Sequence, residues 1–306
     1  MTPVYFDLRH ATVYPSSAPH RAFNSSRCEA FRPLIQQHSC KACVAASLAT
    51  VLSIQACLAL GRSDIAYSAQ HIWDCYDGSC ASGVRAPLIR TFFPYIASLA
   101  PLRGAVEHLT NSNYSACTSV SAQHLVGVQA HQALGNSSAS VMAMRAHIHS
   151  VGPVMALARM TELVFRNFLR PYSPQQKQQQ EAFAMGTHGG RYLSHALAVI
   201  GWRNTDGAWL VQNSMGPNWQ DNGVGWVLGP LEAEWYGFQL DVQPPSFASA
   251  TEPDLPFYYR ARSNVAVESS LVAITLTCLG VACLLCFCIR PLPRAEPYVW
   301  PHAVCP

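Results

Sequence analysis

Charged side chains are scarce in this sequence. Only 12% of the 306 residues are charged, and the formal net charge is +3. No basic stripe interleaved with aromatic residues is present, so we expect no nucleic-acid partner. The opening residues, MTPVYFDLRH, contain neither an apolar run nor a small-residue cleavage site. We therefore expect no signal peptide at this end of the sequence.

Cysteine is missing from the middle of the chain. Seven of the twelve cysteines lie between Cys28 and Cys117, none lies between residues 118 and 277, and five follow. Two of the seven, Cys40 and Cys43, form a C-x-x-C pattern within QHSCKACVAAS. This pattern alone is compatible with a redox pair, half of a zinc site, or a structural cysteine beside a nucleophile.

The first two of these interpretations have little further support. A zinc site needs two more ligands at short spacing, and the candidates are Cys75 and Cys80. A thioredoxin-like pair follows a strand in a βαβ unit, whereas the preceding FRPLIQQH predicts only a weak strand. We therefore expect neither a metal nor a cofactor.

Charge is absent from one long stretch near the end of the sequence. Ser270 to Ile289 is an uncharged run of twenty residues, which is long enough to cross a bilayer as a helix. Arginines flank it on both sides, so the positive-inside rule does not decide its orientation. We predict a globular unit at 1–242, a Pro/Ser-rich stalk at 243–268, a transmembrane helix at 269–289 and a short tail at 290–306.

Within the globular unit, residue patterns predict an α+β fold. The run Cys43 to Leu60 is rich in Ala and Leu and stops at Gly61, which is typical of a helix. Val199 to Trp202 and Trp209 to Gln212 resemble short strands separated by the turn 204–207. The polar segment 173–181, SPQQKQQQE, predicts a surface loop.

Cys43 at the start of a helix is a candidate nucleophile. Unpaired N–H groups and the helix dipole stabilise a thiolate there. Such a nucleophile needs an imidazole to accept its proton and a third group to orient that imidazole. His195, in SHALAVIGW, and Asn213, in QNSMGPNW, would meet if their strands form a hairpin. His188 is the rival base, and Asn213 alone is also compatible with an ordinary turn residue.

These motifs together resemble the papain-like cysteine peptidases, from about Phe6 to Trp226. The resemblance implies a helical domain and a β-barrel-like domain with an active-site cleft between them, acting on polypeptide substrates. It also implies roles for individual residues: Cys43 as nucleophile, His195 as acid/base, Asn213 as the group that holds the imidazole, Gln37 as oxyanion donor, and Ser82, Gly83 and Ser194 as substrate-binding residues.

The cysteine spacing is similar to the cathepsin B branch of that family. This resemblance implies disulfides Cys28–Cys57, Cys40–Cys80 and Cys75–Cys117, which leave Cys43 over. Three disulfides imply an oxidising compartment, so we expect a lumenal or extracellular domain, as in a lysosomal, endosomal or secretory location. The sequons at Asn24, Asn113 and Asn136 agree with this location.

Several positions depart from the family pattern. Lys41 and Val44 stand where the family usually has glycine and tryptophan, and Met215 replaces the tryptophan that shields the His–Asn hydrogen bond. Ser82 replaces a substrate-binding glycine, and the cathepsin B occluding loop is missing, so we expect no dipeptidyl-carboxypeptidase activity. The sequence favours a monomeric, membrane-anchored cysteine endopeptidase. The alternative is a peptidase-fold protein that binds peptides without cleaving them.

Overall fold

The computed structural model describes residues 3–13, 22–31, 35–61, 63, 66–74, 79–81, 83, 107–108, 127–134, 138–186 and 192–241. All of them belong to one compact unit of the chain. The predicted stalk, transmembrane helix and tail lie outside the described residues and stay predictions.

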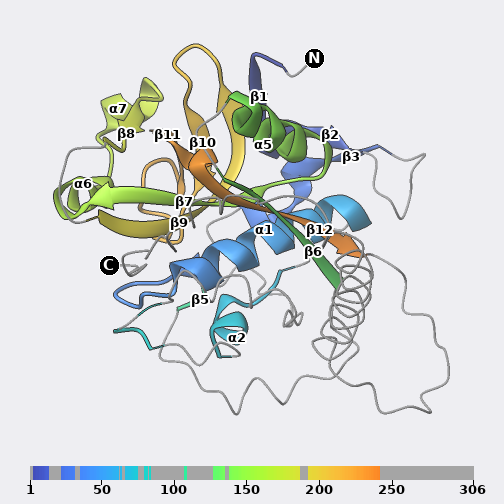
Figure 1. The fold of residues 1–306 in the computed structure, drawn as a ribbon, viewed down its shortest axis with the longest axis horizontal. Helices are drawn as coiled ribbons and strands as arrows, with labels where there is room; N and C mark the ends of the chain where they lie inside the picture. Colours follow the sequence, from blue (N-terminus) through green and yellow to red (C-terminus); the bar gives the residue numbers. More distant parts are fainter. Residues whose placement is uncertain are drawn as a thin grey trace, which may run out of the picture. The chain divides into compact units, whose positions relative to one another are not determined.

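One mixed sheet forms the centre of this unit (Figure 1). Its strands follow the order β6-β12-β7-β9-β10-β11-β8, and β1 pairs with β9 in addition. The pairs are antiparallel except for β11 with β8. The strands are β1 (Tyr5–Asp7), β6 (Gly127–Leu134), β7 (Val154–Thr161), β8 (Ala182–Ala184), β9 (Tyr192–Arg203), β10 (Trp209–Gln212), β11 (Val224–Leu228) and β12 (Glu234–Asp241).

Besides four short 3-10 helices, the remaining described elements are α-helices and minor strands. The helices are α1 (Cys43–Leu60), α2 (Ala69–Asp74), α5 (Ser138–Ser150), α6 (Glu162–Phe168) and α7 (Pro174–Gln178). Two small sheets pair β2 (Thr12–Val13) with β3 (Phe23–Asn24) and β4 (Ile35–Gln36) with β5 (Glu107–His108). The mixture of helices and strands confirms the α+β prediction.

Helix α1 has the predicted bounds because its sequence supplies both a helical interior and a stop. It ends at Gly61, which adopts the left-handed conformation (φ 63°) and donates its N–H to Cys57 O. Among the described helices, α1 alone is long and apolar enough to cross a membrane, yet 83% of that window is buried inside the protein. It is therefore the core helix of this unit.

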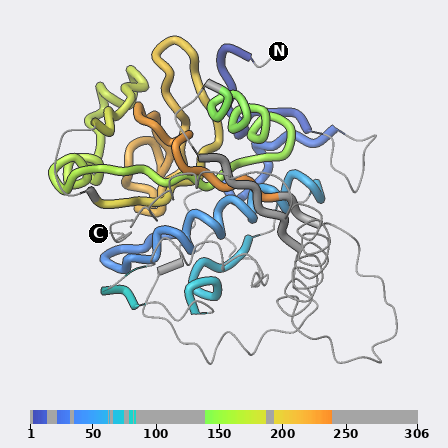
Figure 2. The backbone as a smooth tube through the Cα atoms, in the orientation of Figure 1, coloured from blue at the N-terminus to red at the C-terminus, as the bar shows by residue number. Residues whose placement is uncertain are grey.

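Alternation along the central strands puts different side chains against α1 and α5. Met155, Leu157, Ala196 and Ala198 join the hydrophobic cluster that contains α1. The residues between them on the same strands join the cluster that contains Met144 and the rest of the buried α5 face. Strand residues point alternately to the two faces of a sheet, so the sheet lies between α1 and α5. Figure 2 shows the blue tube of α1 running beside the orange β12.

Two local expectations need correction. Strand β9 has twelve residues, from Tyr192 to Arg203; it includes His195 as expected but is longer than the run predicted at Val199 to Trp202, because its pairing with β7 continues to Thr161 opposite Tyr192. The expected loop 173–181 contains the short helix α7, because Ser173 and Gln176 form a reciprocal capping box and proline occupies the first turn. The turn 204–207 lies between β9 and β10, as predicted.

Candidate active site

Cys43 is the first residue of α1, as the sequence predicts. Its sulfur accepts a hydrogen bond from the backbone N–H of Ala196 at 3.4 Å, so it lies beside the residue that follows His195. The side chain is 1% exposed. In this structure Cys43 is disulfide-bonded, with its partner sulfur outside the described residues. The expectation that Cys43 is the cysteine left over therefore does not describe this state, which is oxidised.

His195 and Asn213 are joined directly. His195 lies in β9, and Asn213 follows β10, whose last residue is registered with Ala198. The hairpin brings His195 Nε2 to 2.8 Å from Asn213 Oδ1. Because an amide oxygen only accepts hydrogen bonds, Nε2 carries the proton in this pair. That tautomer leaves Nδ1 as the basic atom, and Nδ1 has no hydrogen-bond partner among the described residues.

Burial controls the basicity of His195. The imidazole is fully buried, and this lowers the pKa of His195 to about 4, although the hydrogen bond to Asn213 acts in the opposite direction. No charged side chain is among the causes of the shift. A neutral imidazole is therefore favoured at neutral pH in this oxidised state.

Gln37, six residues before Cys43 in the sequence, is fully buried. Its Nε2 donates to Cys40 O at 3.0 Å, and its Oε1 accepts a hydrogen bond from Ser214 Oγ. The amide orientation is thereby fixed with nitrogen toward the segment that leads to Cys43. An amide nitrogen has two hydrogens, so one remains for another acceptor.

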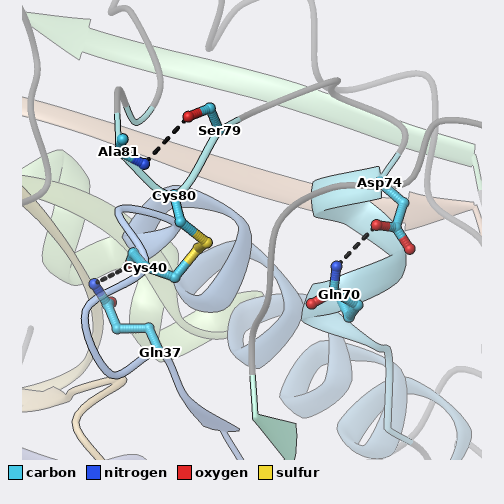
Figure 3. The surroundings of a disulfide bond; sticks show 7 residues. All are labelled: Gln37, Cys40, Gln70, Asp74, Ser79, Cys80 and Ala81. Carbon is cyan, nitrogen blue, oxygen red and sulfur yellow. Dashed lines mark hydrogen bonds between the residues drawn. A yellow bond between two sulfur atoms is a disulfide. The ribbon is translucent and has the colours of Figure 1, made fainter.

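The disulfide Cys40–Cys80 secures the same segment (Figure 3). It is reinforced by the backbone N–H of Lys41, which donates to Cys80 O at 3.1 Å. The structure also contains the disulfide Cys28–Cys57, which fastens the C-terminal part of α1. The third expected disulfide, Cys75–Cys117, lies outside the described residues.

Two aromatic rings from α6 cover the imidazole. Phe165 and Phe168 meet the ring of His195 edge-on, with centroid distances of 5.5 and 5.9 Å. The sequence analysis assigned these two rings no role. The available signal was the i, i+3 spacing of the two phenylalanines, which places them on one face of a helix.

The remaining expected site residues make no described side-chain contact with Cys43, His195 or Asn213, or lie outside the described residues. Gly83 adopts φ 68°, and Ser194 is half-buried on β9 opposite Arg159. Asn24 is exposed and caps a short helical turn through its Oδ1. Ser82, Asn113, Asn136 and His188 lie outside the described residues.

Comparisons with known proteins agree with this geometry. Residues 15–229 match the model of the papain family of cysteine proteases. Among solved structures, procathepsin B S9 from Trypanosoma congolense aligns with a TM-score of 0.54 at 21% identity, over 79% of each chain. Procathepsin L 3 from Tenebrio molitor larval midgut aligns with a TM-score of 0.53 at 15% identity, over 78% of this chain and 70% of that one. No curated protein matches the chain.

The family match spans more than half of the chain. The protein therefore belongs to the papain family of cysteine proteases. The resemblance read from the sequence motifs is confirmed, and the two structural likenesses show the same fold.

Proposed function

We propose that this protein is a cysteine endopeptidase that uses Cys43, His195 and Asn213 as its catalytic triad. The observation that carries the proposal is the 2.8 Å contact between His195 Nε2 and Asn213 Oδ1, next to a sulfur held 3.4 Å from Ala196 N. The buried hydrogen bond fixes the imidazole tautomer and leaves Nδ1 as proton acceptor. This is the arrangement that activates a thiol nucleophile.

The proposed reaction has two stages. In the first, Nδ1 of His195 takes the proton of Cys43, the sulfur attacks the scissile carbonyl carbon, and the amine leaves with the proton returned by His195. In the second, water attacks the acyl-enzyme, His195 again accepts and returns the proton, and the carboxylic product leaves. The backbone N–H of Cys43 and the second hydrogen of Gln37 Nε2 stabilise the oxyanion.

The oxidised site must first be reduced. Cys43, His195 and Gln37 are at most 1% exposed, and Cys43 is disulfide-bonded, so its sulfur is not a free thiol in this structure. A thiol reductant converts that disulfide into two thiols and is itself oxidised to a disulfide. We therefore expect activity only after mild reduction that spares Cys28–Cys57 and Cys40–Cys80.

An active-site-directed epoxide or vinyl sulfone tests the proposal. After mild reduction, mass spectrometry should find the label on Cys43, and the Cys43→Ala variant should remain unlabelled. Asn213→Ala should still fold and bind the reagent, but we expect its labelling rate to fall by one to two orders of magnitude, or about 10- to 100-fold. Absence of labelling in folded, reduced protein would contradict the proposal.

The buried, oxidised site favours a second candidate, a protein that binds peptides without cleaving them. In that case a fluorescent peptide library should bind reduced wild type and Cys43→Ser equally, with no cleavage products by mass spectrometry. Cleavage by wild type that disappears in Cys43→Ser supports the peptidase instead.

We further propose a membrane-anchored protein with its peptidase domain on the lumenal or extracellular side. The uncharged run 269–289, the disulfides and the exposed sequon at Asn24 support this placement. Peptide glycosidase treatment of protein expressed in animal cells should reduce its apparent mass, and Asn24→Gln should remove part of that shift. If the domain carries no glycan and is cleaved by a protease added on the cytosolic side of the membrane, this placement is wrong.

A further inference from the structure

Helix α6 packs its buried face against the imidazole of His195. Phe165 and Phe168 are 3% and 0% exposed, and both rings stand nearly perpendicular to the imidazole of His195, with interplanar angles of 65° and 68°. Edge-to-face geometry is the favourable one for aromatic pairs. The two rings therefore occupy the apolar side of the His195 environment.

The helix is held at both ends. At its start, Thr161 Oγ1 accepts a hydrogen bond from Val164 N, which caps the first turn. At its end, Phe168 O accepts a hydrogen bond from Trp219 Nε1 at 2.7 Å, and the two rings pack with centroids 5.0 Å apart. Trp219 follows Asn213 closely in the chain, so α6 is fastened to the segment that carries the partner of His195.

Met215, at the position of the tryptophan that shields the His–Asn hydrogen bond in the family, supplies less cover than α6 does. Met215 is only half-buried and packs at the margin of the same cluster. A methionine side chain is also flexible. The rigid, water-excluding surface around the histidine therefore comes from α6.

We propose that Phe165 and Phe168 are positioning residues that keep water from the His195–Asn213 hydrogen bond and fix the plane of the imidazole. A hydrogen bond in a dry, low-dielectric environment is stronger than one in contact with water. Losing either ring would admit water and allow the imidazole to rotate. The importance of this shielding for catalysis rests on the proposed peptidase function, whereas the exclusion of water from His195 does not depend on it.

Ordinary core packing is the competing explanation. Phe183 on β8 provides a matched control, because its ring packs against Phe168 at 5.3 Å. No ring contact among the described residues joins Phe183 to His195. If these rings only pack the core, substitution of any of the three phenylalanines should loosen the cluster in the same way. If Phe165 and Phe168 shield His195, only substitution of these two should let water reach the imidazole.

The test uses nuclear magnetic resonance on the full chain carrying Cys43→Ser, which removes the thiol and its disulfide. The imidazole contacts Asn213 at the end of β10, the sulfur of Cys43 lies at the backbone N–H of the next residue, Ala196, and the charged groups of α6 are the exposed pair Glu162 and Arg166. In this background Phe165→Leu, Phe168→Leu and Phe183→Leu are each compared with the parent. The readouts are the solvent-exchange rate of the His195 Nε2 proton and the titration of the imidazole.

We expect Phe165→Leu and Phe168→Leu to speed exchange about tenfold or more, because the hydrogen bond is opened to water. The pKa of His195 should rise from about 4 toward the ordinary 6.5 as burial is relieved. Phe183→Leu should leave both readouts near the parent. Unchanged readouts at Phe165 and Phe168, or equal changes in all three variants, would overturn the proposal.

Two further measurements complete the test. Thermal unfolding shows which variants fold, and if Phe168→Leu does not, Phe165→Leu decides the matter, because its ring is the nearer one to His195. The magnetic-resonance readouts do not depend on turnover. Altered readouts in the Cys43→Ser variants, together with wild-type protein that cleaves no peptide after reduction, would support the cover and refute the peptidase function.

Discussion

Ser214 donates a hydrogen bond from its hydroxyl to Oε1 of Gln37. The backbone of Ser214 extends this connection, since its carbonyl accepts from the N–H of Gln37 at 2.9 Å and its own N–H donates to Asn213 Oδ1 at 2.9 Å. One residue thus contacts both the proposed oxyanion donor and the group that orients the histidine. The two halves of the proposed machinery are coupled through it.

Ser214→Ala should lower kcat while leaving KM nearly unchanged. Without the hydroxyl, Gln37 Oε1 is a buried acceptor with one partner fewer, and its amide is free to rotate away from the transition-state oxygen. Loss of an oxyanion donor costs about two to three orders of magnitude in rate. Because the amide remains present, we expect a smaller loss of about tenfold, measured by steady-state peptide hydrolysis after reduction.

Ser140→Ala is the control for that variant. Ser140 is also buried, and its hydroxyl donates to Glu232 O at 2.8 Å on the far side of the sheet from α1. Each substitution should reduce the free energy of unfolding by about 1–3 kcal/mol, since Ser214→Ala removes the donor to Gln37 Oε1 and Ser140→Ala removes both the donor to Glu232 O and the acceptor of Trp235 Nε1. A similar loss of kcat in both variants would show that Ser214 acts only through stability.

The sequence was sufficient for elements with strong local signals. Helix α1 was predicted to the residue because an Ala/Leu-rich run ends at a glycine, and the β9–β10 hairpin because apolar runs flank a polar turn. The extra length of β9 was missed, since it depends on pairing with β7. Helix α7 was missed because its stability comes from capping by Ser173 and not from an apolar face.

The parts of the site that lie within short sequence motifs could be predicted. The prediction that His195 and Asn213 meet followed from the hairpin. The hydrogen bond of Gln37 to Cys40, the Ser214 hydroxyl contact and the cover from α6 did not follow, because each joins segments that are distant in sequence or depends on side-chain orientation. The disulfide at Cys43 was not expected, because cysteine counting paired the other six cysteines of residues 28–117 among themselves.

Removing the Cys40–Cys80 disulfide should impair both stability and activity. The bond closes a sequence separation of 40 residues, for which chain entropy gives about 4 kcal/mol. It also fixes Cys40, whose carbonyl accepts from Gln37. We expect Cys40→Ser/Cys80→Ser to lose that stability in urea unfolding and, in the folded fraction, to lose kcat.

The disulfide Cys28–Cys57 offers a comparison of similar size. Its sequence separation is 29 residues, and it lies in a cluster without the proposed catalytic residues. Cys28→Ser/Cys57→Ser should lose about 3–4 kcal/mol of stability but keep its kcat when assayed well below its unfolding temperature. Equal loss of kcat in the two double variants would contradict a special role for Cys40–Cys80.

Gly216→Ala should be more harmful than Gly207→Ala. Both glycines have positive φ, 76° and 74°, so an added Cβ is strained in each. At Gly216 the Cβ would also lie 3.0 Å from Gln36 Cδ and Oε1, whereas at Gly207 nothing lies within 4 Å. We expect about 1 kcal/mol of destabilisation at Gly207 and about 2–3 kcal/mol at Gly216, measured by urea unfolding. Equal effects would show that Gln36 moves aside.

Burial of His195 should make the folded protein sensitive to mild acid. Its folded pKa of about 4 lies below the ordinary value of 6.5. The unfolded chain therefore binds the proton first as the pH falls, so stability is intact above 6.5 and declines between 6.5 and 4. The slope should be about 1.4 kcal/mol per pH unit, or roughly 3 kcal/mol in total.

Urea unfolding of Cys43→Ser and of Cys43→Ser/His195→Gln between pH 7 and 4 isolates this contribution. Replacing the thiol in both proteins removes its own titration and its disulfide. The stability advantage of the histidine protein should shrink steadily below pH 6.5, because glutamine cannot take up a proton and the other titrating groups are shared. Parallel stability curves would mean that water reaches His195 in the folded state, and would thereby also contradict the cover provided by α6.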